Sequence, residues 1–198
     1  MTDGTRVTTV CGEADPLYGA ACEAWQLQIG LAAEPGLVAA QARLVDHGGA
    51  LHLTLPDALH ITVLPLIDVG ERLSAPAAVL WERHGAAWQG AIAQACAATP
   101  PLGLRFTCLR AFPRAVVALD EASALAAFRA RLAVTCGLPE RPARIPGITH
   151  VTLARFRHPA RVSVAEALDV TVEVRSLRLV RETIYPTLAF ETVARFTL

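Results

Sequence analysis

Hydrophobic and polar positions alternate over parts of this chain and recur with a helical period over others. Residues 25–31 alternate, with Gln26 and Gln28 on the polar face, which predicts a strand with one apolar face. From Pro35 the apolar positions take helical spacing, so we expect a helix that ends at Gly48-Gly49. Apolar runs over residues 51–55 and 59–67 predict two further strands, the first ending at a proline turn.

The later part of the chain begins with an alanine-rich segment. Residues 76–98 predict a long amphipathic helix in which Trp81 and Trp88 are packing residues and two glycines are weak points. Beyond it we expect a strand pair over 102–109 and 115–119, and then a helix that Asp120 caps. This helix takes its apolar positions from Leu125, Phe128, Leu132 and Val134. Three prolines then lead to a strand from His150, and two last strands follow over 170–182, with a bulge at Arg175-Ser176, and 187–198.

The order of elements is similar in two halves of the chain, residues 24–100 and 101–198, which suggests a structural pseudo-repeat. Residues 1–23 carry little periodic signal and predict an extended or loosely packed N-terminal arm. We therefore expect a single bilobal domain over 24–198, of the α+β class. Its two pseudo-symmetric lobes of mainly antiparallel sheet carry helices packed outside and have a central cleft between them.

Two of the predicted strands carry a histidine and a threonine separated by one apolar residue, in His60-Ile61-Thr62-Val63 and His150-Val151-Thr152-Leu153. Side chains two apart on a strand point to the same side, so each strand presents an imidazole beside a hydroxyl. If the halves pair about a two-fold axis, both pairs converge on one cleft. The alternative is two core histidines bonded to nearby backbone. A third copy, His52-Leu53-Thr54, ends at Pro56, and we interpret His52 as a residue of a neighbouring strand.

Composition excludes several classes of protein. The 198 residues include 18 basic and 18 acidic side chains, so no overall field attracts nucleic acid or an anionic membrane. The five cysteines are odd in number and widely spaced, which predicts free thiols in a reducing cytosol. We find no signal peptide and no apolar run long enough for a membrane span, and we expect a cytoplasmic protein without an obligate protein partner.

The two motifs, His60-Ile61-Thr62-Val63 and His150-Val151-Thr152-Leu153-Ala154-Arg155, resemble the paired signature of the two-histidine phosphoesterase superfamily. That superfamily includes bacterial RNA 2',3'-cyclic phosphodiesterases, also called 2'-5' RNA ligases. The likeness covers residues 24–198 and includes the opening strand and helix, the motif separation and a tyrosine-containing connection into the last strand. Val63 and the Leu64-Pro65 continuation depart from the family pattern.

The resemblance implies hydrolysis of a 2',3'-cyclic or related cyclic phosphodiester, with 2'-5' ligation as its reverse, and without metal or cofactor. One of His60 and His150 would take a proton from water while the other donates one to the leaving ribose oxygen, and the sequence leaves their roles open. Thr62 and Thr152 would hydrogen-bond the non-bridging oxygens, where charge grows in the transition state. The substrate is a cyclic-phosphate nucleotide or an RNA end.

Further side chains are candidates for binding that substrate. Arg155 resembles the arginine of the family motif, but by strand alternation it faces away from His150 unless the strand bends after Leu153. Tyr185 and Phe112 lie in connections and are candidates for stacking on a base. Gln26 and Gln28 are candidates for lining the same cleft.

Three other functions stay open. A metal site built from His60, His150 and His52 lacks neighbouring cysteine or carboxylate ligands in the sequence. A cysteine nucleophile lacks an accompanying histidine. A non-catalytic protein that binds a nucleotide or an RNA end would use the same cleft, although binding alone needs neither an acid nor a base.

Overall fold

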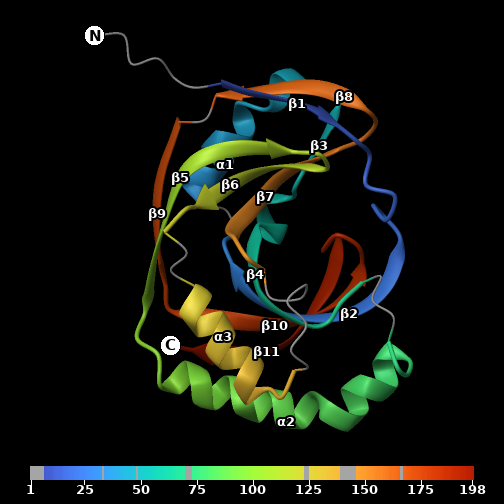
Figure 1. Cartoon of the computed structure of the whole chain (residues 1–198), viewed down its shortest axis with the longest axis vertical. Helices are drawn as coiled ribbons and strands as arrows, with labels where there is room; N and C mark the ends of the chain where they lie inside the picture. The colour runs from blue at the N-terminus through green and yellow to red at the C-terminus, as the bar shows by residue number, and fades with distance from the viewer. Residues whose placement is uncertain are drawn as a thin grey trace.

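The computed structural model describes residues 7–32, 34–47, 49–69, 73–122, 125–138, 146–165 and 167–198. The expectations for Gly48 and for the prolines at 139 and 142 lie outside these ranges. Figure 1 shows two curved sheets, and the strands that carry the two motifs, one from each sheet, contact each other near the centre of the molecule. The expected α+β fold, with two lobes of mainly antiparallel sheet and helices outside, is confirmed.

Each lobe contains one antiparallel sheet. The first sheet has four strands in the order β11 (Ala189–Thr197), β10 (Ser176–Ile184), β2 (Ala21–Gly30) and β4 (His60–Ile67). The second has five in the order β3 (Leu51–Leu53), β7 (Thr149–Phe156), β6 (Ala115–Asp120), β5 (Leu102–Phe112) and β9 (Ala167–Val174). A ribbon of β1 (Val7–Gly12) and β8 (Ala160–Ala165) extends beside the second sheet (Figure 1).

The lobes exchange strands, so they differ in composition from the halves 24–100 and 101–198. Strand β3 comes early in the chain and pairs with β7 in the second sheet, while β10 and β11 come late and complete the first sheet. The exchange also corrects the strand expected over 170–182. Its residues form two strands in different sheets, and Arg175 lies at the crossing rather than in a bulge.

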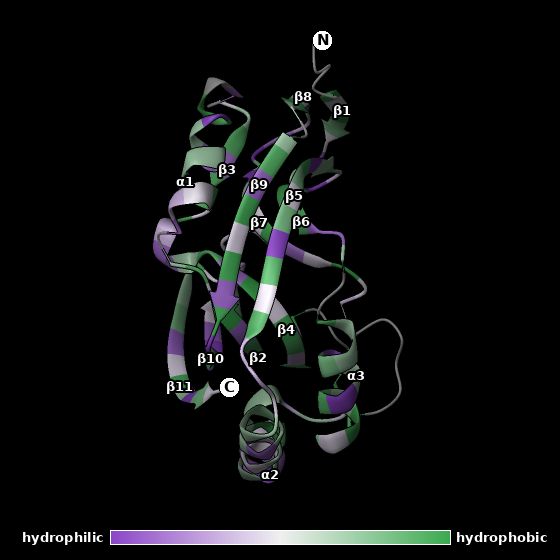
Figure 2. Ribbon diagram, turned by 90° about the vertical axis from the view of Figure 1, so that its left-hand side faces the viewer, coloured by the Kyte–Doolittle hydropathy of each residue, from purple (hydrophilic) through white to green (hydrophobic). Residues whose placement is uncertain are grey.

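Within the described ranges, three α-helices cover the outer faces of the sheets (Figure 2). Helix α1 (Pro35–Ala42) contacts β7 and β9, α2 (Ala77–Ala97) contacts β2 and β11, and α3 (Ala126–Thr135) contacts α2 and β4. Helix α1 is shorter than expected and is followed by the 3-10 turn η1 (Val45–His47), and a second such turn, η2 (Pro56–Ala58), precedes β4. No helix in the described part of the chain is long and apolar enough to cross a bilayer.

Helix α2 runs unbroken past both glycines that were expected to weaken it. A Cβ on Gly85 would lie 2.8 Å from the indole of Trp81, so glycine leaves room for that ring. Trp81 stacks on Trp25 of β2 with ring centroids 5.1 Å apart, and Nε1 of Trp88 donates to the carbonyl of Cys136 at 3.0 Å. The packing role expected for both α2 tryptophans is confirmed.

Helix α3 differs from its expected form at both ends. Asp120 accepts the N–H of Ala122 through Oδ1 and therefore closes a turn rather than capping α3, whose N-cap position is Leu125. Val134 was expected on the apolar face but is 81 % exposed. Arg129 is buried among the apolar positions instead, at 2 % exposure.

The segment before β2 is also tied to the rest of the chain. Strand β1 pairs with β8 over its whole length, and the N–H groups of Gly19 and Tyr185 bond the carbonyls of Tyr185 and Ala20. Residues 7–20 are therefore packed against the protein rather than loosely attached. The division of the chain at residue 23 stays a prediction.

Candidate active site

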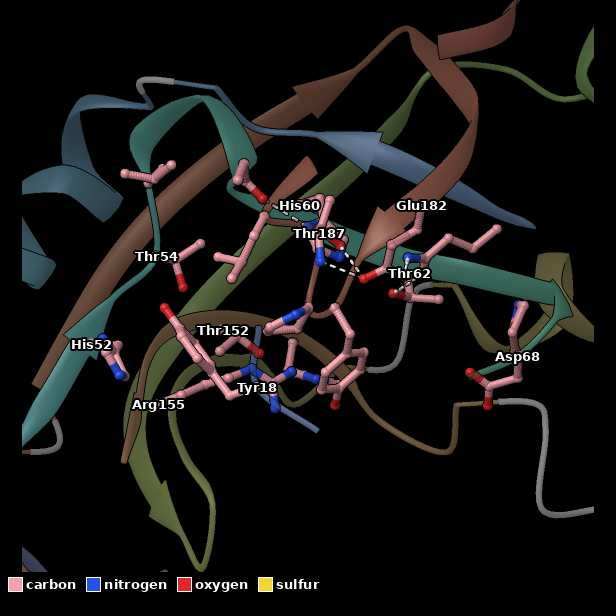
Figure 3. Close-up of a pocket in the computed structure, with 18 of the residues that line it drawn as sticks. Tyr18, His52, Thr54, His60, Thr62, Asp68, Thr152, Arg155, Glu182 and Thr187 are labelled. Atoms are coloured by element: carbon pink, nitrogen blue, oxygen red, sulfur yellow. Dashed lines mark hydrogen bonds between the residues drawn. The ribbon is translucent and has the colours of Figure 1, made fainter. Parts of the chain in front are cut away.

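The two histidine–threonine pairs face the same cavity. His60 and Thr62 lie on β4, His150 and Thr152 lie on β7, and all four side chains line a cavity of about 290 Å³ (Figure 3). The apolar residues between them, Ile61 and Val151, are fully buried on the other side of their strands. The alternation expected for both motif strands is therefore present, and it leaves the polar side chains at the cavity.

Both motif strands bulge directly after the threonine. On β4, Thr62 pairs with Gln28 of β2 and Leu64 pairs with the adjacent Leu27. Val63 is therefore the extra residue of the bulge. On β7 the same shift leaves Leu153 as the extra residue opposite β6. A bulge reverses the alternation that follows it, and Arg155 consequently lines the cavity. The bend that a phosphate contact from Arg155 requires is present.

Each bulge is held by a polar side chain from the helix of the opposite half. Nε2 of Gln41, on α1, donates to the carbonyl of Leu153 at 2.9 Å and to that of Thr54 at 2.7 Å. Nε of Arg129, on α3, donates to the carbonyl of Val63 at 3.1 Å. The Leu153 carbonyl also accepts the backbone N–H of Thr54 at 2.9 Å, so Gln41 uses its second lone pair. The two crossed bonds obey the pseudo-symmetry of the lobes.

Arg129 also joins the two motif strands to each other. Its Nη2 donates to the carbonyl of Thr62 at 2.8 Å, and its Nη1 donates to the carbonyl of Ile148 at 3.1 Å and to Oγ1 of Thr149 at 3.2 Å. All of these acceptors are neutral. Burial lowers the pKa of Arg129 to about 10, partly offset by Asp120, so the guanidinium stays charged at neutral pH.

A carbonyl two residues earlier in the chain orients His60, and the equivalent carbonyl lies near His150. Nδ1 of His60 lies 2.7 Å from the carbonyl oxygen of Ala58. This contact favours the neutral tautomer with its proton on Nδ1, which leaves Nε2 unprotonated for the cavity. Nδ1 of His150 is buried and makes no hydrogen bond of good geometry within the described ranges. The Ile148 carbonyl, at the equivalent position, is near enough to raise the pKa of His150.

The environment of both histidines favours the neutral imidazole. Burial lowers the pKa of His60 to about 4. The Ala58 hydrogen bond raises this pKa, and the charges of Arg178 and His150 lower it further. Burial also lowers the pKa of His150, and the charge of Arg129 acts in the same direction. Each histidine thus has its own buried arginine, whose charge disfavours the imidazolium form.

Arg155 is held by the segment that precedes β2. Its Nη1 lies 2.8 Å from Oδ2 of Asp15, and the hydroxyl of Tyr185 donates to the same oxygen at 3.1 Å. The guanidinium also lies over the Tyr185 ring, 5.2 Å from its centroid. Tyr185 therefore lines the cavity beside Arg155, and Asp15 orients both side chains.

An aromatic pair forms another part of the wall. Tyr18 stacks on His52 with ring centroids 4.2 Å apart, and both side chains line the cavity (Figure 3). His52 lies on β3, which neighbours β7 as expected, but it lines the cavity as well. No sequence motif marked Tyr18.

The remaining candidates are divided. Gln26 lines the cavity and accepts the Thr62 hydroxyl at 3.0 Å, whereas Gln28 is buried against Arg178 and is absent from the cavity wall. Phe112 lines an adjoining, mainly apolar cavity of about 390 Å³ that shares His150, Thr152 and Arg155 with the first. All five cysteines are free, and within the described ranges no three histidine, cysteine or carboxylate side chains form a group that could hold a metal ion.

Comparison with known proteins identifies the family of this chain. A family model described as the 2'-5' RNA ligase superfamily matches residues 32–183, and the chain belongs to this superfamily of two-histidine phosphoesterases. No protein of the curated set is similar enough to count as a relative.

Solved structures share the fold. TT0787 of Thermus thermophilus is 23% identical with a TM-score of 0.68, over 88% of this chain and 97% of that one. LigT of E. coli in its apo form is 16% identical with a TM-score of 0.64, over 90% and 99%. LigT complexed with 3'-AMP has a TM-score of 0.62 at 16% identity, over 89% and 98%.

Proposed function

We propose that this protein hydrolyses a cyclic phosphodiester, of the 2',3'-cyclic kind, on a nucleotide or an RNA end. The observation that carries the proposal is the convergence of His60 and His150 on one cavity, each beside a threonine and each close to a buried arginine. Membership of the superfamily supports an enzyme of this class. The nucleotides bound by LigT, which include 3'-AMP and ATP, support a nucleotide as the ligand.

The residues divide the reaction into two proton transfers. The neutral imidazole of one histidine removes a proton from the attacking water, and the protonated imidazole of the other donates a proton to the leaving ribose oxygen. Because both pKa values are lowered in the free cavity, the anionic substrate itself supplies the field that protonates the acid. Thr152 and Arg155 face the non-bridging oxygens, where negative charge grows.

Turnover of defined substrates tests the proposal. A panel of 2',3'-cyclic mononucleotides, an oligonucleotide ending in a 2',3'-cyclic phosphate, and ADP-ribose 1'',2''-cyclic phosphate is assayed with and without a chelator. We expect hydrolysis that the chelator leaves unchanged, and a loss of about 10²–10⁴-fold in His60→Ala and in His150→Ala. His84→Ala, on the exposed side of α2, is the matched control and keeps the wild-type rate. Binding of these ligands without turnover would instead support a non-catalytic binding protein.

A further inference from the structure

The two motif threonines differ in how their hydroxyl protons are used. Oγ1 of Thr62 donates to Oε1 of Gln26 at 3.0 Å, whereas the Thr152 hydroxyl has no hydrogen bond within the described part of the chain. A hydroxyl carries a single proton. While Thr62 donates to Gln26, it can only accept, so a phosphate in the cavity meets one donating hydroxyl instead of two.

The direction of the Thr62 bond is set by Glu182. Nε2 of Gln26 donates to Oε2 of Glu182 at 2.8 Å, and Oε1 of Glu182 accepts both the backbone N–H and, at 3.5 Å, the hydroxyl of Thr187. An ionised carboxylate only accepts hydrogen bonds. It therefore holds the amide nitrogen of Gln26 towards itself and leaves the amide oxygen facing Thr62.

We propose that Glu182 is a positioning residue that decides, through Gln26, whether Thr62 donates its proton to the substrate phosphate. When Oε2 of Glu182 takes up a proton, its O–H donates to Oε1 of Gln26, and the amide turns over. Nε2 of Gln26 then donates to Oγ1 of Thr62, which frees the Thr62 proton for a non-bridging oxygen. The rearrangement takes up one proton and keeps every bond of the chain, because Oε1 of Glu182 still accepts from Thr187.

The surroundings of Glu182 couple this proton to ligand binding. Glu182 is 3 % exposed, and burial and the charge of Asp68 raise its pKa, while the Thr187 bonds and the charge of Arg155 act in the opposite direction. Cys22 on β2 and Tyr185 after β10 are the other titratable side chains against it. A phosphate anion in the same cavity adds a like charge, which favours the protonated carboxyl.

Glu182→Gln tests the inference with a near-isosteric change. The N–H of Thr187 fixes the new amide oxygen in place of Oε1, so the new amide nitrogen lies at the Oε2 position and donates to Gln26. The variant is thereby held in the state in which Thr62 donates. In the wild type we expect kcat/KM on a cyclic phosphodiester to decrease on the alkaline side with the loss of two protons, one from Glu182 and one from the acidic histidine. In Glu182→Gln we expect it to decrease with the loss of one proton, so that kcat/KM of the variant exceeds that of the wild type at alkaline pH. An unchanged profile, or an equal loss at every pH, would overturn the inference.

A second measurement is independent of turnover, so failure of the proposed function does not remove the test. Calorimetric titration with 3'-AMP in buffers of different ionisation enthalpy gives the protons taken up on binding. We expect the wild type to take up more protons than Glu182→Gln, and Thr62→Val, which removes the hydroxyl at the other end of the chain, to take up fewer than the wild type. Thr62→Val also lowers kcat by about 10²-fold if turnover is present. Glu191→Gln, on the exposed side of β11, behaves as the wild type. Equal proton uptake by wild type and both chain variants contradicts the inference.

Discussion

Nη1 of Arg155 lies 2.8 Å from Oδ2 of Asp15, and this ion pair joins two residues 140 positions apart in the chain. The side chain of Asp15 is 3% exposed and that of Arg155 is 19% exposed, so the pair is shielded from solvent. Asp15 precedes the region that the superfamily model matches, which begins at residue 32. The segment before β2 thus supplies Tyr18 to the cavity wall and Asp15 as the partner of Arg155, both from outside the matched residues.

Asp15→Asn is expected to weaken substrate binding more than it slows chemistry. The variant keeps the shape of the side chain but removes the charge that orients Arg155, so we expect KM for a cyclic nucleotide to rise about tenfold and the free energy of unfolding to fall by about 3 kcal/mol. Steady-state kinetics and urea unfolding measure the two effects. Asp169→Asn removes a similar but exposed partner, that of Arg105, and leaves both quantities unchanged. An Asp15→Asn enzyme with wild-type KM would show that Arg155 does not depend on this pair.

Arg129→Met is expected to identify the role of His150. The charge of Arg129 lowers the pKa of His150, so its removal raises that pKa. If His150 is the acid, the alkaline limb of kcat/KM moves to higher pH, and if it is the base, the acid limb moves to higher pH. NMR titration of the His150 ring measures the pKa itself. The variant also loses about 3 kcal/mol of stability, because buried carbonyls lose their donor.

Two neighbouring variants control this experiment. Arg129→Lys keeps the positive charge but lacks the separate N–H donors of the guanidinium. We therefore expect this variant to lose stability while the His150 pKa stays near its wild-type value. Arg131→Met removes the exposed arginine of the same helix, whose Nη2 donates to Oγ1 of Thr99, and is expected to leave the His150 pKa unchanged. A His150 pKa that is equal in the wild type and in Arg129→Met contradicts the proposed electrostatic coupling.

The stability of the protein is expected to fall as pH decreases from about 6.5 to about 4. His60 has a pKa near 4 in the folded chain and the ordinary value of 6.5 when unfolded, so in this window the unfolded chain binds the extra proton. The stability linked to His60 is therefore fully present above pH 6.5 and is lost through pH 4, up to about 3 kcal/mol. Urea midpoints measured against pH should decline less in His60→Gln. Parallel curves for the two proteins would exclude the depressed pKa.

Phe112→Ala is expected to separate short substrates from long ones. Phe112 lines the adjoining cavity, which shares His150 and Thr152 with the first, and is absent from the wall of the first cavity. We therefore expect a cyclic mononucleotide in the first cavity to make no contact with Phe112, and a group attached beyond the phosphate to reach it. We expect unchanged kcat/KM for 2',3'-cyclic mononucleotides and a decrease of about tenfold for an oligonucleotide with the same end. An equal decrease in kcat/KM for both substrates would show that Phe112 contributes to the first cavity and contradict the prediction.

Local patterns predicted the strands that carry the motifs because their alternation is set by burial on one side. The exchange of strands between the lobes was not predictable from them. Residues 170–182 have the pattern of one strand, and only the pairing of β9 with β5 and of β10 with β2 shows that they belong to two sheets. Strand alternation also placed Arg155 on the wrong side, because the bulge at Leu153 is defined by the register with β6.

Arg129 and Asp15 were missed for different reasons. Arg129 occupies a position of the apolar stripe formed by Leu125, Phe128 and Leu132, and a charged residue in such a stripe was the available signal. Asp15 gave only a turn signal with Pro16, because its partners Arg155 and Tyr185 are distant in sequence. Contacts of this length come from the tertiary fold and leave no periodic trace.

The crossed bonds of Gln41 and Arg129 bear on how the chain acquires its structure. Each motif strand is completed by a helix from the other half, and each sheet needs at least one strand from the other half. We therefore expect the two halves to fold together in one cooperative transition, and to fold slowly because the contacts are distant in sequence. A chain cleaved after residue 100 should accordingly yield fragments that are inert alone and regain a functional cavity only on reassociation.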